Sequence, residues 1–203
     1  MHVIGAGGHA KVVLDIILSA ETPVFGIWDE NILVKSLLNN KILGTLNGFQ
    51  KAESDQYIIA IGSNKIRKKI ADQLGKSTSM ALHASSVVGS NVELGEGTVL
   101  MPNVSVNAGS KVGKHVIINT NASVDHDCII ADFVHISPQV GLAGGVHVGE
   151  GTHIGIGASV LQNIKIGRWV TIGAGTVIIS DVPDYAVVVG NPGKIIKYHK
   201  DEY

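Results

Sequence analysis

The sequence predicts two parts: a small α/β domain over residues 1–78 and an all-β parallel β-helix over residues 79–203. The main observation is a six-residue period, because an aliphatic residue stands at every sixth position from Leu82 to Ile178. The second observation is a change of pattern, since apolar runs before Leu82 alternate with glycine turns and helical stretches. Composition agrees with both: aromatic residues make up 4% of the chain and glycine occurs 25 times, as closely stacked short strands require.

The hexapeptide period defines the second part of the chain. A second residue stands four positions after each aliphatic one, and it is Ser, Thr, Ala or Val everywhere except at Cys128 and Ile164. This second residue therefore stands two positions before the next aliphatic one. Residues two positions apart on a strand share a face, so each hexapeptide predicts one short strand with two inward side chains. Three such sides make a coil of 18 residues, and residues 18 apart stack along the axis. The aliphatic series is Leu82, Val88, Leu94, Leu100, Val106, Val112, Ile118, Val124, Ile130, Ile136, Leu142, Val148, Ile154, Val160, Ile166, Ile172 and Ile178.

The first 78 residues predict strands near residues 3–4, 24–29 and 57–61, with helices over about 9–20 and from about residue 65. We interpret the basic run over residues 65–71 as a solvated helix face. The unit supplies half of a doubly wound, Rossmann-like sheet, so a mononucleotide or nucleotide-sugar is expected rather than a dinucleotide. After Ile178 we expect a turn-rich tail.

The segment Gly5-Ala6-Gly7-Gly8-His9 follows the first strand and opens the first helix. In that context backbone N–H groups and the positive helix end can approach a phosphate. The acidic pair Asp29 and Glu30 lies some 20 residues on, where a ribose or uracil contact would be made. A tight turn between strand and helix is the alternative.

The segment Asp125-His126-Asp127 is the candidate for catalysis. His126 stands two residues after inward Val124 and two before inward Cys128, so it is expected on a turn and exposed. A carboxylate beside it can hold one ring nitrogen and make the other more basic, as a general base requires. The alternative is a solvated turn residue. Gly144 lies one coil above His126, where its N–H group could stabilise an oxyanion.

His135 and its stacked partner His153 lie half a coil away from His126. Within one chain they therefore face away from it. If His126 and His135 share a site, they come from different chains, and the seams of a cyclic trimer would bring them together.

Charge and cysteine content exclude several classes of protein. With 16 Lys and Arg against 17 Asp and Glu, the net charge of −1 gives no reason to expect a nucleic acid partner. No apolar run approaches the length that spans a bilayer, and the start lacks a signal-peptide pattern, so we expect no membrane partner and a soluble cytoplasmic protein. Cys128 is the one cysteine, which excludes an intramolecular disulfide, and its inward position predicts a core residue rather than a thiol nucleophile.

Three segments together resemble one enzyme family: Gly5 to His9, Ile59 to Ile70, and Asn119 to Cys128. They are similar to bacterial nucleotide-sugar acetyltransferases of the left-handed β-helix class. The most similar group is the UDP-4-amino-sugar N-acetyltransferases of the bacillosamine pathway, with sialic acid O-acetyltransferases as relatives. The resemblance spans nearly the whole chain, and it implies a left-handed helix and acetyl-CoA as co-substrate, with no metal. The homotrimer is expected from the 18-residue spacing described above.

The resemblance also implies residue roles. His126 would be the general base, and Asp127 would raise its basicity. The family has Glu where this chain has the shorter Asp127, so Asp125 stays open as the partner, and Ala174 stands in place of a glycine. Nucleotide-sugar binding would fall to Gly7, Gly8, His9, Asp29, Glu30, Gly62 and Asn119. Acetyl-CoA binding would fall to His135, Gly144, Ile156 and Ala174.

The activity that the resemblance implies is direct acetyl transfer from acetyl-CoA to the 4-amino group of a UDP-linked amino-deoxy sugar. The 18-residue spacing of Pro138, Ile156 and Ala174 independently predicts a track along the axis, which suits an extended pantetheine arm. Acetylation of a hydroxyl in sialic acid or another sugar is one alternative. The others are a zinc hydrase of the β-helical carbonic anhydrase type, with His135 and His153 as ligands, and a scaffold rod without catalysis.

Overall fold

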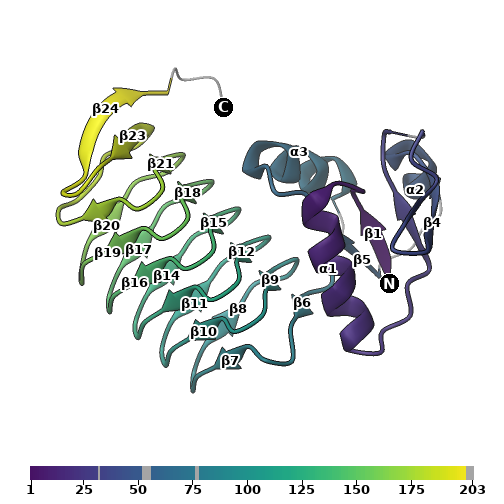
Figure 1. The fold of residues 1–203 in the computed structure, drawn as a ribbon, viewed down its shortest axis with the longest axis horizontal. Coiled ribbons are helices and arrows are strands. Elements are labelled where there is room, and N and C mark those ends of the chain that lie inside the picture. The colour runs from purple at the N-terminus through teal and green to yellow at the C-terminus, as the bar shows by residue number, and fades with distance from the viewer. Residues whose placement is uncertain (32, 52–55, 76–77, 200–203) are drawn as a thin grey trace.

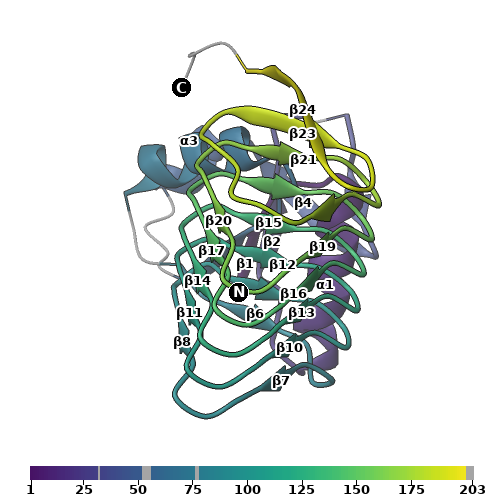
Figure 2. The same cartoon turned by 90° about the vertical axis from the view of Figure 1, so that its left-hand side faces the viewer.

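The computed structural model describes residues 1–31, 33–51, 56–75 and 78–199. A small α/β domain lies against one side of a long three-sided β-helix (Figure 1). Turned by 90°, the β-helix shows two of its sides as neighbouring columns of short strands (Figure 2). No helix in the described ranges is long and apolar enough to cross a membrane.

The N-terminal domain has a five-stranded sheet of order β3-β4-β2-β1-β5. Its inner strands are parallel, and β3 pairs antiparallel with β4 at the edge. The predicted strands and both predicted helices are present. The short elements β3, β4 and α2 were not predicted, because their sequences show no clear hydrophobic period. The elements are β1 His2–Ile4, α1 Gly8–Ser19, β2 Gly26–Trp28, β3 Ser36–Leu37, β4 Asn40–Gly44, α2 Leu46–Lys51, β5 Tyr57–Ile59 and α3 Asn64–Leu74.

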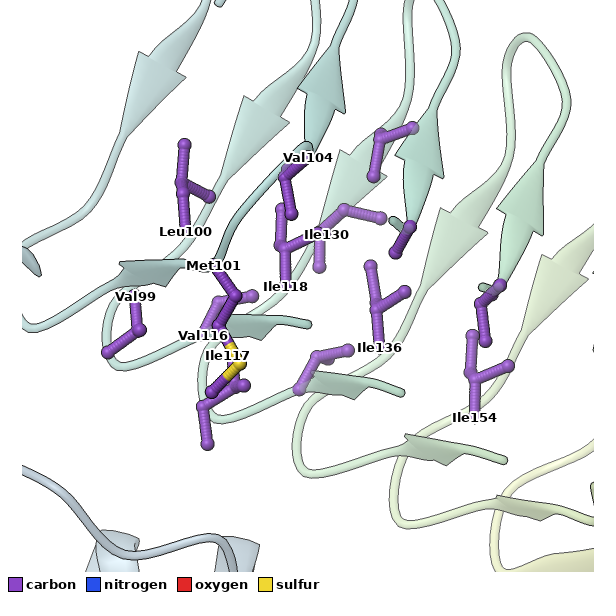
Figure 3. Close-up of a cluster of buried hydrophobic side chains, with 14 of the residues drawn as sticks. Val99, Leu100, Met101, Val104, Val116, Ile117, Ile118, Ile130, Ile136 and Ile154 are labelled. Carbon is purple, nitrogen blue, oxygen red and sulfur yellow. The ribbon is translucent and has the colours of Figure 1, made fainter. Parts of the chain in front are cut away.

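The β-helix confirms the hexapeptide prediction strand by strand. Within residues 78–199, β6 to β22 are two residues long, and the second residue of each is a member of the aliphatic series. Successive strands pass to successive sides, so each strand pairs in parallel with the strand 18 residues away, as His135 does with His153. The interior is a stack of aliphatic side chains in which Leu100, Ile118, Ile136 and Ile154 form one column (Figure 3).

The three sides differ in the outward residue that begins each strand, and we name them accordingly. The docked face lies against the N-terminal domain and comprises β6 Ala81–Leu82, β9 Val99–Leu100, β12 Ile117–Ile118, β15 His135–Ile136, β18 His153–Ile154 and β21 Thr171–Ile172. The small-residue face comprises β7 Val87–Val88, β10 Ser105–Val106, β13 Ser123–Val124, β16 Gly141–Leu142, β19 Ser159–Val160 and β22 Val177–Ile178. The charged face comprises β8 Glu93–Leu94, β11 Lys111–Val112, β14 Ile129–Ile130, β17 His147–Val148 and β20 Lys165–Ile166.

Outward residues of the docked face explain where the N-terminal domain sits. Ala81, Val99 and Ile117 point out of the prism yet are buried, in one apolar cluster with Val13 and Ile17 of α1. Figure 1 places α1 beside β6 and β9. Burying an aliphatic side chain stabilises by roughly 1.5–3 kcal/mol, so this patch fixes the domain on the face.

Helix α3 makes the second contact, through a buried arginine. Arg67 is 1% exposed, and its guanidinium donates to the carbonyl oxygens of His115 and Phe133 at 2.8 and 2.9 Å. Asn64 Nδ2 donates to the carbonyl oxygens of Gly151 and Thr152. The interpretation of residues 65–71 as a solvated face is therefore wrong at Arg67. Its guanidinium is hydrogen-bonded to carbonyl oxygens at a corner of the β-helix instead of to water.

The C-terminal segment has turns at residues 184–185 and 190–193 and closes the last coil, as expected, but it also contains two strands that were not predicted. Strand β23 (Ala186–Val189) continues the docked face in parallel with β21, and β24 (Lys194–Tyr198) returns antiparallel to it. The hairpin covers the end of the docked-face sheet, where β21 would otherwise present unpaired backbone groups.

Candidate active site

The corner between the small-residue face and the charged face, which we call the His126 corner, carries Asp125-His126-Asp127. Both His126 and Asp127 are exposed there, with 62% and 73% of their side chains accessible. His126 Nδ1 donates a hydrogen bond to Asp127 Oδ2 at 2.8 Å, which leaves Nε2 as the basic nitrogen. This hydrogen bond is the main cause that raises the pKa of His126, and the Asp125 charge adds to it.

Asp125 has other partners. Its Oδ1 accepts hydrogen bonds from Asn107 Nδ2, one coil below, and from the His126 backbone N–H, each at 2.8 Å. These bonds lower the pKa of Asp125. Of the two acids that the sequence left open, Asp127 holds the imidazole in this geometry, and Asp125 fixes the backbone of the turn.

Gly144 lies directly over the His126 ring. A Cβ atom on Gly144 would lie 2.6 Å from His126 Cε1 and Nε2, so a larger residue would displace the imidazole. Together with Gln162 and Asn163, the pair lines a surface hollow of about 410 Å³. The predicted proximity of His126 and Gly144 is thus present, while the roles of His126 as a base and of the Gly144 N–H toward an oxyanion remain predictions.

Cys128 is buried behind this corner. Its Sγ lies 3.3 Å from the carbonyl oxygen of Ala143, to which it donates, and burial raises the pKa of the thiol. A protonated, enclosed thiol does not act as a nucleophile.

A second group of predicted residues lies at the edge of the N-terminal sheet where β1 and β5 end, and we call this edge the crevice. Strand β1 pairs with β2 on one side and with β5 on the other, so the turns after β1 and β5 border the point where strand order changes direction. Gly7 precedes α1 and Gly62 lies just before α3, so both helices begin at this edge. No side chain of the described residues caps α1, whereas the Ser63 hydroxyl accepts from the Ile66 N–H of α3. A Cβ atom on Gly7 or Gly8 would meet no atom within 4 Å. Open space beside backbone donors suits a phosphate group.

Asp29 and Glu30 border the same region. Asp29 Oδ2 accepts a hydrogen bond from the Ala6 N–H at 2.6 Å, so it shapes the glycine turn, and Glu30 Oε1 accepts one from the Leu46 N–H at 3.1 Å. With residues of α3 such as Lys69, they line a cavity of about 410 Å³.

The crevice meets the docked face at His135. The His135 ring donates from Nδ1 to the carbonyl oxygen of Gly62 at 3.3 Å, and its Nε2 lies 3.2 Å from Asn119 Nδ2, which donates to it. His9 lies beside it, with ring centroids 6.2 Å apart. Gly62, His9 and Asn119 of the predicted nucleotide-sugar set are therefore together, and His135 joins them rather than the other predicted acetyl-CoA residues.

The histidines of this region are held neutral. The pKa of His135 is lowered to about 3, first by burial and then by the charges of His153 and Arg67. The pKa of His9 is lowered to about 4, first by burial and then by the charge of Arg67. Burial also lowers the pKa of Arg67 itself, to about 9. The Nε2 atom of His9 is buried and has no hydrogen-bond partner within the part of the chain that the structure describes.

The remaining predicted residues lie at the corner between the docked face and the small-residue face, which we call the Ile156 corner. Pro138, Ile156 and Ala174 follow one another there along the axis, and Ile156 is 51% exposed. Asn119 begins the same corner two coils below Gly155. The His126 corner and the Ile156 corner are the two edges of the small-residue face, so one chain holds the predicted base and the predicted track apart.

Two residues of the site were missed from the sequence. The first is Asn107, which donates a hydrogen bond to Asp125. The sequence indicated this contact, because Asn107 stands 18 residues, one coil, before Asp125. The second is Arg67. The sequence indicated that it could be buried, because Asn64, Arg67, Ala71 and Leu74 are spaced as one face of a helix.

The zinc alternative finds no support in the histidine pair. His135 and His153 stack with ring centroids 4.9 Å apart, but Ser137 Oγ contacts His153 Nε2 at 2.9 Å, and both nitrogens of His135 have protein partners. Among the described residues, no group of three or more His, Cys, Asp or Glu side chains is placed to hold a metal ion.

Comparison with known proteins gives two matching family descriptions. Residues 1–74 match the PglD N-terminal domain, and residues 145–180 match the bacterial transferase hexapeptide with six repeats. Among curated relatives, GDP-perosamine N-acetyltransferase of Escherichia coli O157:H7 is 26% identical over 96% of this chain and 95% of its own. The chain spans 15% of an uncharacterised protein of Acanthamoeba polyphaga mimivirus and 56% of a serine acetyltransferase of Buchnera aphidicola.

Solved structures match nearly the whole chain. PerB from Caulobacter crescentus, in complex with CoA and GDP-perosamine, is 38% identical with a TM-score of 0.90, covering 97% of this chain and 96% of that one. The acetyltransferase domain of PglB from Neisseria gonorrhoeae, in complex with acetyl coenzyme A, is 37% identical with a TM-score of 0.90, covering 96% and 98%. With both halves of the fold and its repeats matched, the chain belongs to the left-handed β-helix, hexapeptide acyltransferase family whose members carry a PglD-type N-terminal domain.

Proposed function

We propose that this protein is an acetyl-CoA-dependent N-acetyltransferase that acts on the 4-amino group of a UDP-linked amino-deoxy sugar. The observation that carries the proposal is the exposed His126, with Nδ1 on Asp127 and Nε2 over Gly144. The crevice at Gly7, Gly8 and Gly62 supplies a place for the diphosphate. PerB, which binds CoA and GDP-perosamine, and the PglB domain, which binds acetyl coenzyme A, support the two substrate classes.

The proposed reaction needs one proton acceptor and no covalent acyl-enzyme. The sugar amine attacks the thioester carbon, the C–S bond breaks, and CoA leaves as the thiol. His126 Nε2 takes the proton that the amine loses, and Asp127 stabilises the resulting imidazolium. The imidazolium then gives that proton to the departing CoA sulfur, which leaves as the thiol. Buried Cys128 takes no part.

The Ile156 corner fits an extended acyl carrier. Ile156 and Ala174 are exposed along a straight line of stacked turns, which offers apolar contact to a pantetheine arm. His135 and Asn119 stand between this corner and the nucleotide crevice, so the sugar would extend from Gly62 past His135 toward the track.

A cyclic homotrimer completes the site. If three prisms turn their small-residue faces toward a common axis, the two edges of that face meet those of the neighbours. The His126 corner of each chain then lies beside the Ile156 corner of the next. The seam combines His126 and Gly144 of one chain with the track, His135 and crevice of another.

Thiol release tests the chemistry. Acetyl-CoA is incubated with UDP-4-amino-sugars, GDP-4-amino-sugars and sialic acid, and the free CoA thiol is measured. We expect turnover with a UDP-4-amino-sugar. Turnover with the GDP-linked sugars alone would overturn the choice of nucleotide, and turnover with sialic acid alone would overturn transfer to an amine.

Subunit mixing tests the seam. His126→Ala removes the base, and Ala174→Trp blocks the track at the opposite edge of the same chain. Each variant alone should be inactive, whereas exchanged trimers should regain activity, since some seams receive an intact base and an intact track. Verified mixed trimers without activity, or a fully active monomer, would contradict the shared site.

A further inference from the structure

One position of the His126 corner recurs in five successive coils. The residue type at that position alternates between glycine and Asn or Asp, and the proposed function does not explain this alternation. Residues 91, 109, 127, 145 and 163 occupy the same place in successive turns, and all five have positive φ, between 57° and 76°. They are Asn91, Gly109, Asp127, Gly145 and Asn163. Left-handed backbone is tolerated best by glycine, asparagine and aspartate, which accounts for the residue types but not for their order.

The order follows from where the side chains point. A Cβ atom on Gly145 would lie 2.5 Å from Asn163 Oδ1, and a Cβ atom on Gly109 would lie 2.6 Å from Asp127 Oδ1. In both cases the side chain points to the coil below, into space that a glycine leaves open.

We propose that Gly109 is a positioning residue for the base, because it keeps free the space that the Asp127 carboxylate occupies while it accepts the hydrogen bond from His126. Oδ1 of Asp127 fills the gap over Gly109, and Oδ2 of the same carboxylate receives His126 Nδ1 at 2.8 Å. A methyl group at position 109 would turn the carboxylate, and the second oxygen would leave the imidazole.

The effect falls on the carboxylate rather than on the fold. After Asp127 Oδ1, the nearest atoms to a Cβ at position 109 are Asp127 Cγ at 3.7 Å and Asp127 N at 3.9 Å, which are ordinary contacts. The Asp127 side chain is 73% exposed, so a carboxylate displaced by a methyl group at position 109 can turn into solvent. The substitution also strains the left-handed backbone of position 109, where φ is 76°, but its close contact is with the carboxylate, so the orientation of the base is what it removes specifically.

The pKa of His126 reports this orientation directly. Only Asp125 and Asp127 carry charge among the residues that line the hollow around His126, and Asp125 is held by Asn107. We expect Gly109→Ala to lower the pKa of His126 from its raised value toward the ordinary value of about 6.5, as measured by NMR titration of the ring. His126→Gln identifies the signal among the nine histidines.

Three further variants make the test specific. Gly109→Asn adds a Cβ with a residue that the same position tolerates at Asn91 and Asn163, in case alanine prevents folding. Gly145→Ala is the matched control, since it carries the same left-handed strain in the same corner but displaces Asn163, and it should leave the pKa of His126 unchanged. In an Asp127→Gly background, Gly109→Ala should change the pKa of His126 no further.

The inference rests on the proposed function only in its consequence for rate, where the pH midpoint of kcat/KM should shift down together with the pKa of His126. A folded Gly109 variant with the wild-type pKa would overturn it, and so would an equal drop in the Asp127→Gly background. Loss of fold in both the alanine and asparagine variants would overturn it too, since Gly109 would then serve the backbone. Absence of acetyl transfer in the wild type would instead reject the proposed function and leave the titration result standing.

Discussion

In the proposed function the chemistry depends on His126. We expect His126→Ala to lower turnover by a factor on the order of 10² to 10⁴, the usual contribution of a positioned base, with the fold intact because the side chain is exposed. The wild-type rate should fall as pH drops through the pKa of His126, which lies above its ordinary value because of Asp127. Thiol release across pH measures both, and a variant with near wild-type turnover at neutral pH would remove His126 from the role.

The two acids beside His126 should differ in effect. Asp127→Asn should cost less activity than His126→Ala, because the imidazole stays while its charged partner is lost, and Asp125→Asn should cost least, because Asp125 contacts backbone and Asn107. Steady-state kinetics on the three variants ranks them. A larger loss for Asp125→Asn than for Asp127→Asn would mean that the turn, rather than the ion pair, controls the base.

At this scale the sequence predicts what is local. His126, Asp127 and Gly144 are adjacent in the chain or exactly one coil apart, so the repeat alone fixes their relation. The contact between His135 and Gly62 joins residues 73 positions apart and depends on how two domains dock, which no periodicity encodes.

At the scale of elements, the most specific prediction concerns ligand binding at the turn between β1 and α1. Gly8→Val should weaken binding of a UDP-sugar and leave the affinity for acetyl-CoA nearly unchanged. The substitution adds atoms to open space beside the free N–H groups of α1, so it obstructs a phosphate without disturbing a packed neighbour. Calorimetry with each ligand provides the comparison, and equal losses for both would show that the domain itself was damaged.

Helices and strands were predictable from the sequence where the hydrophobic period extends over enough residues to be recognised. Helices α1 and α3 and the strands from β6 to β22 follow from their patterns, whereas β3 is two residues long and α2 is six. The burial of Arg67 was hidden because arginine in a basic run matches the pattern of a solvated helix, and the carbonyl oxygens that accept from it belong to turns 48 and 66 residues away.

The docking of the two domains has a pH dependence that belongs to the whole molecule. In the unfolded chain imidazoles bind protons near pH 6.5. In the folded protein burial lowers the pKa of His9 and His115 to about 4 and that of His135 to about 3. The unfolded state thus binds more protons between these values, and the free energy of unfolding should fall as pH is lowered from about 6.5 toward 4.

Thermal unfolding at a series of pH values measures this loss. His115→Asn is a useful comparison, because asparagine tolerates the left-handed backbone of position 115, where φ is 54°, and does not titrate. The variant should lose less stability on acidification than the wild type does, whatever its stability at pH 7. An unchanged slope would show that His115 is not held neutral by its burial.

The unbroken period limits how this chain can change in length. Adding or removing one residue inside a strand between Leu82 and Ile178 would exchange the inward and outward side chains of everything that follows, because neighbouring residues of a strand point in opposite directions. Extra residues must therefore leave the prism at a corner and return to the same place. The other permitted step is a whole coil of 18 residues: inserted after Ala174, it would lengthen the Ile156 corner by about 4.8 Å and leave the His126 pair untouched. The length of the track in the proposed site is thus adjustable in steps of one coil.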